Sequence, residues 1–327
     1  MRKRRTRVRI TLVAVVLVLA LVMVFSGLRI LESTAFYPNT TEPTYPTKTI
    51  VWDGVSYFPR QDITTVLVEG IDEEGPVKDS GSYRNFGEVD MVSLVILDHT
   101  AQQYHIVSIN RDTMVDMPVL GLGGKPAGSF YGQLALAHTY GSGMADSAEN
   151  VLTAVSDLLY GLHIDYYVAL NMDAIGMLND AVGGVTVEVT EDFSQVDPTI
   201  TKGTVTLNRE QAVSYIRSRK DVGTQLNVSR MERQKGYIES LAKTLLEKVE
   251  DSSKFALNLY EELADYAVTD CSATALAGIL DTCAQYEPGR TVTLPGKNVR
   301  GEQYYEFYLD EEQLHPLVLE LFYEPKG

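Results

Sequence analysis

The sequence contains few of the residues that form metal centres and disulfide frameworks. Only two of its 327 residues are cysteines, and no CxxC or Cys/His spacing indicates a zinc site. Cys271 and Cys283 lie in a stretch that is predicted to be helical. Their separation along one helix is about 18 Å, which is too far for a disulfide. We therefore expect both cysteines to be buried free thiols.

Motifs of the common hydrolases and nucleotide-binding proteins are also missing. The five histidines form no HExxH motif and no i,i+4 pair, so we expect them at surface or core positions. The sequence has no GxSxG motif, no P-loop and no GxGxxG in the required context. Nucleophilic serine catalysis and nucleotide binding therefore have no support from the sequence.

Positive charge is scarce outside two places. The formal net charge is −16, yet residues 1–9 carry six basic side chains and no acidic one. The rest of the chain is therefore more acidic than the total suggests. This excludes a nucleic-acid-binding domain, because a phosphate backbone requires a basic face. It also sets apart a second group of basic residues, at 217–233.

One long apolar run follows the basic residues. Residues 10–31 contain a single charged side chain, Arg29, and about 20 apolar residues suffice to span a bilayer. The positive-inside rule places residues 1–9 in the cytoplasm and the remaining chain outside the cell membrane. The alternative is a cleaved signal peptide. The run is long for one, and residues 33–35 offer only a poor cleavage site, so we favour an uncleaved single-pass anchor.

The chain after this run divides into three parts. Residues 32–62 are rich in proline and threonine, which predicts an extended extracellular stalk. Residues 63–323 have the patterning of a folded domain, and residues 324–327 form a short tail. The folded part is long enough to bury a sizeable core.

The folded part begins with apolar stretches at 64–69, 91–97 and 104–109, which predict strands. Further strands alternate with helices along the rest of the chain. This alternation predicts an α/β fold of α-β-α layers, in which a mixed central sheet is flanked by helices. Residues 115–132 are rich in glycine and proline and are predicted to be a loop.

Carboxylates stand at the ends of two of these strands. Asp72 follows the first strand and Asp90 precedes the second. Carboxylates from adjacent strand ends can share a magnesium ion, which takes one or two of them and completes its shell with water and phosphate. Each can also be a turn-capping aspartate. Arg111 and Asp112 follow the third strand, either in an anion site or as a local salt bridge.

The second basic group lies between residues 216 and 234. If residues 214–219 form a strand, Arg217 and Arg219 point to the same face. Guanidinium groups bind carboxylates and phosphates through two parallel hydrogen bonds, so such a pair suits an anion. Taken alone, the same arginines can equally be solvated surface charges.

A helix is predicted directly after these arginines. If Ser229 caps it, Arg230 and Gln234 stand at i,i+4 on one helical face. Lys220 and Arg233 lie in the same group and can instead pair with neighbouring acids. Acids at strand ends and arginines from two later elements together match the charges of a diphosphate with magnesium. An external domain beside a membrane would meet such a group on a lipid carrier.

These stretches resemble the LytR-CpsA-Psr family over residues 63–323. The pattern LNxEQAxxYxRxRKD followed by RxxRQ is specific to it. The matching stretches are TTVLVEGID (64–72), VDMVSLVILD (89–98), HIVSINRDT (105–113), HIDYYVALNMDAIGMLNDAVGGVTVEV (163–189), LNREQAVSYIRSRKD (207–221), SRMERQ (229–234), TVTLPG (291–296) and YYEFYLDEEQLHPLVLELF (304–322).

The resemblance implies a sheet and helices that enclose an apolar channel for a polyprenyl tail. It implies an Mg²⁺-dependent phosphotransferase that moves a glycopolymer, such as teichoic acid or capsular polysaccharide, from a polyprenyl-pyrophosphate carrier to peptidoglycan. By position, Asp72 and Asp90 match the magnesium ligands, and Asp90 can also be a general base. The implied pyrophosphate-binding residues are Arg111, Arg217, Arg219, Arg230 and Gln234. The implied catalytic residues are Asp90, Arg111, Arg217 and Arg219.

The sequence departs from the family pattern at several positions, among them Met91, where a serine or threonine usually follows the acid. Gln133 stands where the family usually has a basic residue, and Ala135 where it has asparagine. Glu88 stands where the family commonly has arginine. Asn110, directly before Arg111, stands where the family commonly has proline or another residue. Two other functions remain open: a polyprenyl-pyrophosphate hydrolase, and a non-catalytic lipid-binding or regulatory module such as a transcription attenuator. The external topology and the lack of a basic DNA-reading helix speak against DNA binding.

Overall fold

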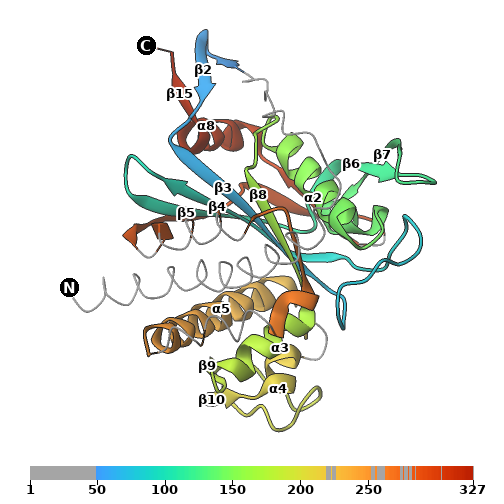
Figure 1. Cartoon of the computed structure of the whole chain (residues 1–327), viewed down its shortest axis with the longest axis vertical. Coiled ribbons are helices and arrows are strands. Elements are labelled where there is room, and N and C mark those ends of the chain that lie inside the picture. Colours follow the sequence, from blue (N-terminus) through green and yellow to red (C-terminus); the bar gives the residue numbers. More distant parts are fainter. Residues whose placement is uncertain are drawn as a thin grey trace.

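A six-stranded mixed sheet forms the centre of the computed structural model (Figure 1), with the strand order β11-β8-β3-β4-β5-β12. The middle strands are antiparallel, whereas β8 runs parallel to β3 and β12 parallel to β5. The strands are β3 (Ile63–Ile71), β4 (Val89–Asp98), β5 (Gln103–Ile109), β8 (Tyr166–Asn171), β11 (Ala267–Thr269) and β12 (Glu287–Thr293). The structure describes residues 49–326 apart from 219–221, 223–225, 252–254, 256–261, 273–274, 276–278, 280–281, 284 and 303.

Helices cover both faces of the sheet because its strands are apolar on both sides. In β3, Val66 and Val68 join one buried cluster, while Leu67 and Ile71 join the other. The first cluster is covered by α3 (Met172–Ala181), α4 (Arg209–Arg217) and α5 (Leu226–Asp251). The second is covered by η1 (Leu134–Tyr140), α2 (Ala145–Leu158) and α8 (Glu311–Phe322). The predicted α-β-α layering around a mixed sheet is confirmed, and the apolar channel stays a prediction.

Three hairpins surround the central layers. The loop predicted at residues 115–132 is wrong, because β6 (Met114–Leu120) and β7 (Pro126–Gln133) pair there. Val115 and Met117 are buried on either side of the exposed Asp116, which fixes the strand; Gly121, Gly123 and Gly124 lie in the turn, whereas Gly128 and Gly132 lie in β7. The other hairpins are β9 (Val185–Val189) with β10 (Gly203–Leu207), and β13 (Gly296–Arg300) with β14 (Tyr305–Leu309).

The two ends of the described chain meet in a small separate sheet. β2 (Val55–Pro59) pairs with β1 (Ile50–Trp52) and with β15 (Tyr323–Pro325). The first two strands lie within the stretch that the sequence assigns to the stalk, and the third overlaps the predicted tail. A short helix, η2 (Ala264–Tyr266), precedes β11.

The basic residues of the second group that the structure describes, Arg217, Arg230 and Arg233, lie in helices. The predicted strand at residues 214–219 is wrong, because α4 continues to Arg217. Asn208 and Gln211 form a capping box at its start, and Ala212, Tyr215 and Ile216 are buried at helical spacing. The predicted cap at Ser229 is wrong as well. Helix α5 begins three residues earlier, at Leu226, and a serine caps only where the backbone before it is not helical.

Two further predictions concern the membrane and the thiols. Among the helices of residues 49–326 that the structure describes, none is both long and apolar enough to cross a bilayer. The predicted membrane span at 10–31 lies outside the described residues, as does the basic segment before it. Cys271 and Cys283 are free and fully buried, which confirms the expectation of two core thiols.

A candidate anion-binding site at one end of the sheet

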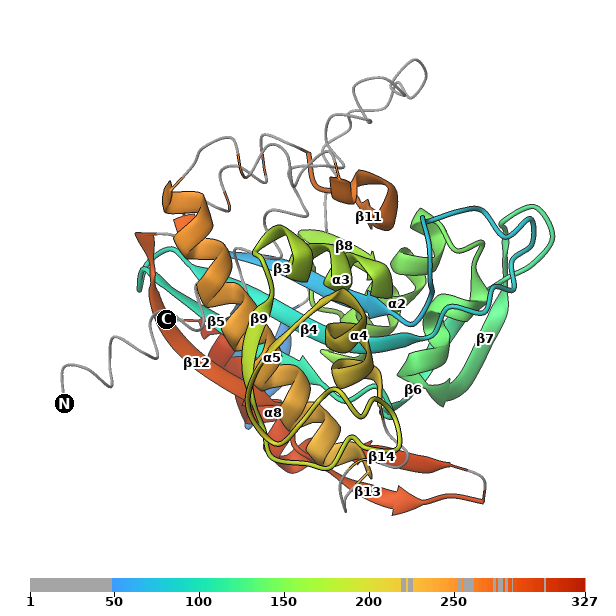
Figure 2. The ribbon, with the colours of Figure 1, turned by 90° about the horizontal axis from the view of Figure 1, so that it is seen from below.

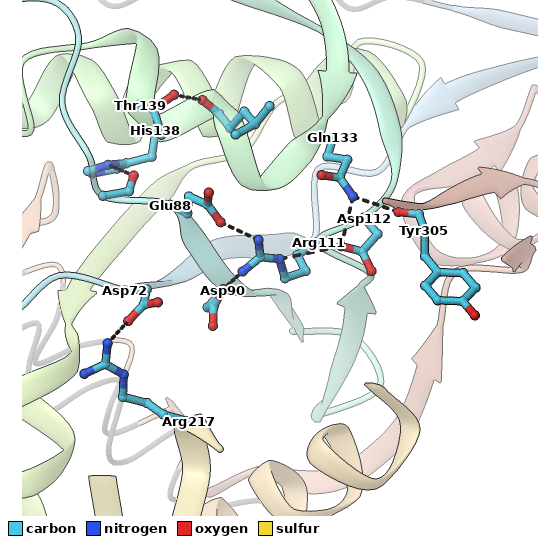
Figure 3. A network of polar contacts seen from close by, with 12 residues as sticks. Asp72, Glu88, Asp90, Arg111, Asp112, Gln133, His138, Thr139, Arg217 and Tyr305 are labelled. Carbon is cyan, nitrogen blue, oxygen red and sulfur yellow. Dashed lines mark hydrogen bonds and ion pairs between the residues drawn. The ribbon is translucent and has the colours of Figure 1, made fainter. Parts of the chain in front are cut away.

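The two strand-end acids lie at the same end of the central sheet. The backbone N–H of Asp72 donates a hydrogen bond to the carbonyl oxygen of Glu88 at 2.9 Å, and Asp90 is the second residue of β4. Antiparallel pairing of β3 with β4 causes this, because the end of one strand meets the start of the other. Figure 3 shows the Asp72 carboxylate beside Arg217 and the Asp90 carboxylate beside Arg111.

Arg111 comes to this place through the register of the next strand pair. Val92 of β4 pairs with Ile109 of β5, and continuing that register sets Arg111 opposite Asp90. Its guanidinium pairs through Nη1 with the Asp90 carboxylate and through Nη2 with Glu88 Oε2 at 2.5 Å. Its Nε lies 3.6 Å from Asp112 Oδ1. A buried arginine is thus surrounded by three carboxylates.

Arg230 reaches Asp90 from the helices that cover one face of the sheet. It lies in α5, and its Nη1 donates to Asp90 Oδ2 at 3.0 Å. Only 2% of Arg230 is exposed, and Asp90 is buried too. Each oxygen of Asp90 therefore faces a different guanidinium, one from the turn after β5 and one from α5. Removing a partner from such a buried pair leaves an uncompensated charge, which is strongly destabilising.

Arg217 is the accessible arginine of the site. It is the last residue of α4, and its Nη2 lies 2.9 Å from Asp72 Oδ1 while its Nη1 donates to Glu74 Oε1 at 2.6 Å. The side chains of Arg217 and Asp72 are 36% and 35% exposed. Solvent-exposed ion pairs contribute little net free energy, so a phosphate can replace these carboxylates at little cost.

Gln234 is the remaining predicted site residue that the structure describes. Arg219 is outside the described residues. Gln234 is in α5, where its Nε2 lies 3.5 Å from the carbonyl oxygen of Ile216 in α4. The structure thus brings Asp72, Asp90 and three of the predicted arginines to one end of the sheet. It places Gln234 against the backbone of the helix that carries Arg217.

Arg233 holds the end of α4 in place. Its guanidinium pairs with Glu191 and donates to the carbonyl oxygens of Tyr215 and Ser218. Such bonds satisfy carbonyls that a helix end leaves without partners. Arg217 lies between these two carbonyl groups in the chain, so Arg233 positions it. The pair with Glu191 is the kind of ion pair that the sequence left open for Arg233. Sequence spacing alone does not reveal this contact, because Glu191 lies far away in the chain.

A buried histidine supports the segment before Asp90. Gly87 packs so closely that an added Cβ would lie 2.9 Å from Ile71 Cγ2 and 3.0 Å from Glu73 Oε2. Its carbonyl oxygen accepts a hydrogen bond from Nδ1 of His138 at 2.9 Å. Burial lowers the pKa of His138 to about 4, so the ring is neutral with its proton on Nδ1. The sequence leaves both a surface and a core position open for this histidine and does not predict the contact.

Gln133 connects the site to a distant hairpin. Its Nε2 donates to Asp112 Oδ1 at 3.3 Å and to the carbonyl oxygen of Tyr305 at 2.8 Å. The neighbouring Ala135 is buried, and its backbone N–H donates to the carbonyl oxygen of Arg111 at 2.9 Å. The neutral amide of Gln133 therefore links Asp112 to Tyr305 of β14. The family resemblance leads us to expect a basic side chain at this position.

Magnesium fits this site only together with a phosphate ligand. In the described part of the chain, no group of three or more His, Cys, Asp or Glu side chains can hold a metal ion by itself. Magnesium in phosphate-binding sites needs only one or two carboxylates, because water and phosphate oxygens complete its shell. The oxygen donors Asp72 and Asp90 fit that requirement, with Asp72 the more accessible.

The fold and the site define an α/β domain that gathers arginines and carboxylates at one end of its sheet. The model of the LytR_cpsA_psr family matches residues 33–321. The chain therefore belongs to the LytR-CpsA-Psr family, as its sequence motifs predict.

Named relatives and solved structures agree with this assignment. The chain is 31% identical over 219 residues to a polyisoprenyl-teichoic acid–peptidoglycan teichoic acid transferase TagU of Enterococcus faecalis, covering 65% of this chain and 61% of that one. The matched stretch covers between 38% and 61% of the length of such curated relatives.

Two solved structures share the fold. Protein gbs0355 of Streptococcus agalactiae superposes with a TM-score of 0.63 at 23% identity, covering 80% of this chain and 86% of that one. The structure of TagT bound to LI-WTA superposes with a TM-score of 0.57 at 22% identity, covering 80% and 90%.

Proposed function

We propose that the protein is a membrane-anchored extracellular phosphotransferase. Its donor is a glycopolymer, teichoic acid or capsule-like, on a polyprenyl-pyrophosphate carrier, and its acceptor is peptidoglycan. The observation that carries this proposal is the convergence of Arg111, Arg217 and Arg230, from three different elements, at one end of the sheet. Family membership and the names of the relatives support the reaction, and the apolar run at 10–31 supports the anchor.

In the proposed mechanism the arginines hold the two phosphates. Arg111 and Arg230 are fixed by Asp90 before the substrate arrives, so they need no reorganisation. Arg217 exchanges Asp72 and Glu74 for phosphate oxygens. Magnesium, held by Asp72 and Asp90, would neutralise charge on the diphosphate. Phosphoryl transfer requires positioning and charge stabilisation above all, and this set of residues provides both.

The bond changes in the proposed reaction are simple. A sugar hydroxyl of peptidoglycan attacks the phosphorus nearest the glycopolymer and forms a phosphodiester. The bond from that phosphorus to the bridging oxygen breaks, and polyprenyl phosphate leaves with the electron pair. The hydroxyl proton passes to a base, a role for which Asp90 is a candidate as the alternative to holding magnesium. The apolar tail of the carrier would lie in a channel between the sheet and its helices.

Product analysis tests this function. The full chain in detergent is incubated with a polyprenyl-pyrophosphate-linked glycan that carries a radiolabel, with magnesium, and with or without peptidoglycan. The proposal predicts label in the peptidoglycan and little release without acceptor. Equal release of free labelled glycan without acceptor would identify a hydrolase. Tight binding of the lipid with no turnover in magnesium would identify a non-catalytic module.

A further inference from the structure

Arg233 is a buried arginine whose three nitrogen atoms all contact protein oxygens. Only 6% of the residue is exposed. Its Nε donates to the carbonyl oxygen of Tyr215 at 3.1 Å, and its Nη2 donates to the carbonyl oxygen of Ser218. Its Nη1 pairs with the carboxylate of Glu191. The guanidinium therefore joins α5 both to the end of α4 and to the loop after β9.

The two carbonyl groups lie on either side of Arg217 in the chain. Arg217 is the last residue of α4, and Ser218 follows it as the C-cap. The carbonyl groups at the end of a helix have no partners within that helix, so they need partners from elsewhere. Arg233 supplies a partner on each side of Arg217. The backbone that carries the accessible arginine of the site is thus fixed against α5.

The loop after β9 sets the direction of the Arg233 guanidinium. Glu191, which pairs with it, is itself mostly buried, with 14% of its side chain exposed. The guanidinium also lies over the ring of Phe193, with 5.4 Å between Cζ and the ring centroid, and this ring stacks on Tyr215 at 5.3 Å. An ion pair on one edge and a ring on one face restrict a planar guanidinium to one orientation. Figure 2 shows β9 and α4 beside α5.

Helix α5 therefore determines the position of two site arginines. Arg230 lies one turn before Arg233 in this helix and pairs with the buried Asp90. Arg233 fixes the backbone of Arg217 to the same helix. Phosphoryl transfer depends on the positions of the groups that contact the phosphates, and a displacement of about 1 Å can cost about a hundredfold in rate. A contact that fixes Arg217 relative to Arg230 can therefore control the reaction without touching the substrate.

We infer that Arg233 and Glu191 are positioning residues of the proposed reaction and that they act on the diphosphate through Arg217. The inference rests on the proposed function and adds two residues to its site. The alternative is a buried ion pair that stabilises the fold and leaves the site unaffected. The two cases differ in one measurable respect, because a positioning residue loses its effect on binding once Arg217 is removed.

Exchange of arginine for lysine separates the shape of the Arg233 side chain from its charge. In Arg233→Lys the ammonium group can keep the pair with Glu191, but its single nitrogen cannot also reach two separate carbonyl groups. Calorimetry on the full chain in detergent measures the Kd for inorganic pyrophosphate with magnesium. We expect Arg233→Lys to raise this Kd about tenfold. The matched control is Lys235→Arg, the reverse exchange at an exposed position of α5, which should leave the Kd unchanged.

A double-mutant cycle with Arg217→Ala decides the inference. In the Arg217→Ala background, adding Arg233→Lys should raise the Kd by about twofold or less, because the side chain that Arg233 positions is absent. An equal loss of affinity in both backgrounds would overturn the inference, since Arg233 would then act on the fold or on the phosphate directly. An unchanged Kd in the single variant Arg233→Lys would overturn it as well. All variants are compared below the temperature at which the least stable one unfolds.

Glu191→Gln extends the test to the transfer reaction. This variant keeps an oxygen acceptor for Arg233 and removes the charge, which weakens the hydrogen bond. We expect kcat/KM for the lipid donor to fall about fivefold, with the KM for peptidoglycan unchanged. A change confined to the KM for peptidoglycan would contradict the inference. Should wild-type protein bind pyrophosphate but transfer nothing, the proposed function fails, and the double-mutant cycle still decides the inference.

Discussion

Arg230 Nη1 donates to Asp90 Oδ2 at 3.0 Å across a separation of 140 residues in the chain. This contact joins α5, on one side of the sheet, to the start of β4, and both side chains are almost completely buried. Asp90 also pairs with Arg111, so it fixes two guanidinium groups at once. The fold thus preorganises the site. The buried Arg230–Asp90 pair should contribute more to the free energy of unfolding than the more exposed Arg217–Asp72 pair.

The buried contact should be important for stability. Arg230→Ala is expected to lower the free energy of unfolding by about 3 to 5 kcal/mol, because Asp90 is left with buried charge that one partner no longer balances. The matched control is Arg290→Ala, which removes an exposed pair with Glu320 and should change stability by about 0.5 kcal/mol or less. Urea unfolding of both variants measures the difference, and equal effects would contradict the buried role of Arg230.

His138 should make the fold sensitive to acid. Burial holds its pKa at about 4 in the folded protein, below the ordinary value of 6.5. The unfolded chain therefore binds a proton first, and stability is lost as pH falls from 6.5 towards 4, by up to about 1.4 kcal/mol per pH unit. His138→Asn keeps a donor for the Gly87 carbonyl but does not titrate. Urea unfolding between pH 4 and 7.5 should show a steeper slope for wild type than for this variant.

Glu69 should have the opposite effect. It is fully buried in β3, and neither carboxylate oxygen has a hydrogen-bond partner in the described part of the chain. Burial, with a smaller contribution from Asp270, raises its pKa well above the ordinary value of 4.5. The folded state keeps a proton that the unfolded state releases, so the contribution of Glu69 to stability is present below pH 4.5 and declines as pH rises. Glu69→Gln should gain stability relative to wild type with increasing pH, and a constant difference would contradict this.

Glu88 should compete with phosphate for Arg111. Its carboxylate lies 2.5 Å from Arg111 Nη2, so an incoming anion must displace it. Glu88→Gln removes that competing charge and is expected to tighten binding of inorganic pyrophosphate by about tenfold. Calorimetry without magnesium measures the change, with Glu320→Gln at the exposed Arg290 pair as the control. Unchanged affinity in Glu88→Gln would show that the phosphate does not contact this face of Arg111.

The sequence allowed the layers and the strand-end acids to be predicted because both depend on local patterns. Continuous apolar stretches indicate buried strands, and adjacent antiparallel strands bring Asp72 and Asp90 to one end. Arg111 follows from the same register. The family pattern supplied Arg217 and Arg230, whose approach to these acids depends on how α4 and α5 pack on the sheet.

Other features depend on contacts that no local pattern records. A strand at residues 214–219 would align Arg217 with Arg219, yet packing of Ala212, Tyr215 and Ile216 against the sheet continues the helix to Arg217. Arg233 reaches Glu191, and Gln133 reaches Tyr305 across 172 residues. The β6–β7 hairpin was hidden by its glycines and prolines, because burial of Val115 and Met117 decides its structure.

Transfer by the Arg217→Ala variant tests the central claim most directly. Arg217 is accessible and lies in an exposed pair, so its loss should leave unfolding unchanged. The control is Arg209→Ala in the same helix, which removes an exposed pair with Asp180 away from the site. The measurement is the rate of radiolabel transfer from the polyprenyl-linked glycan to peptidoglycan. Our account predicts a loss of about a hundredfold or more for Arg217→Ala and none for Arg209→Ala. Wild-type transfer by Arg217→Ala would contradict it.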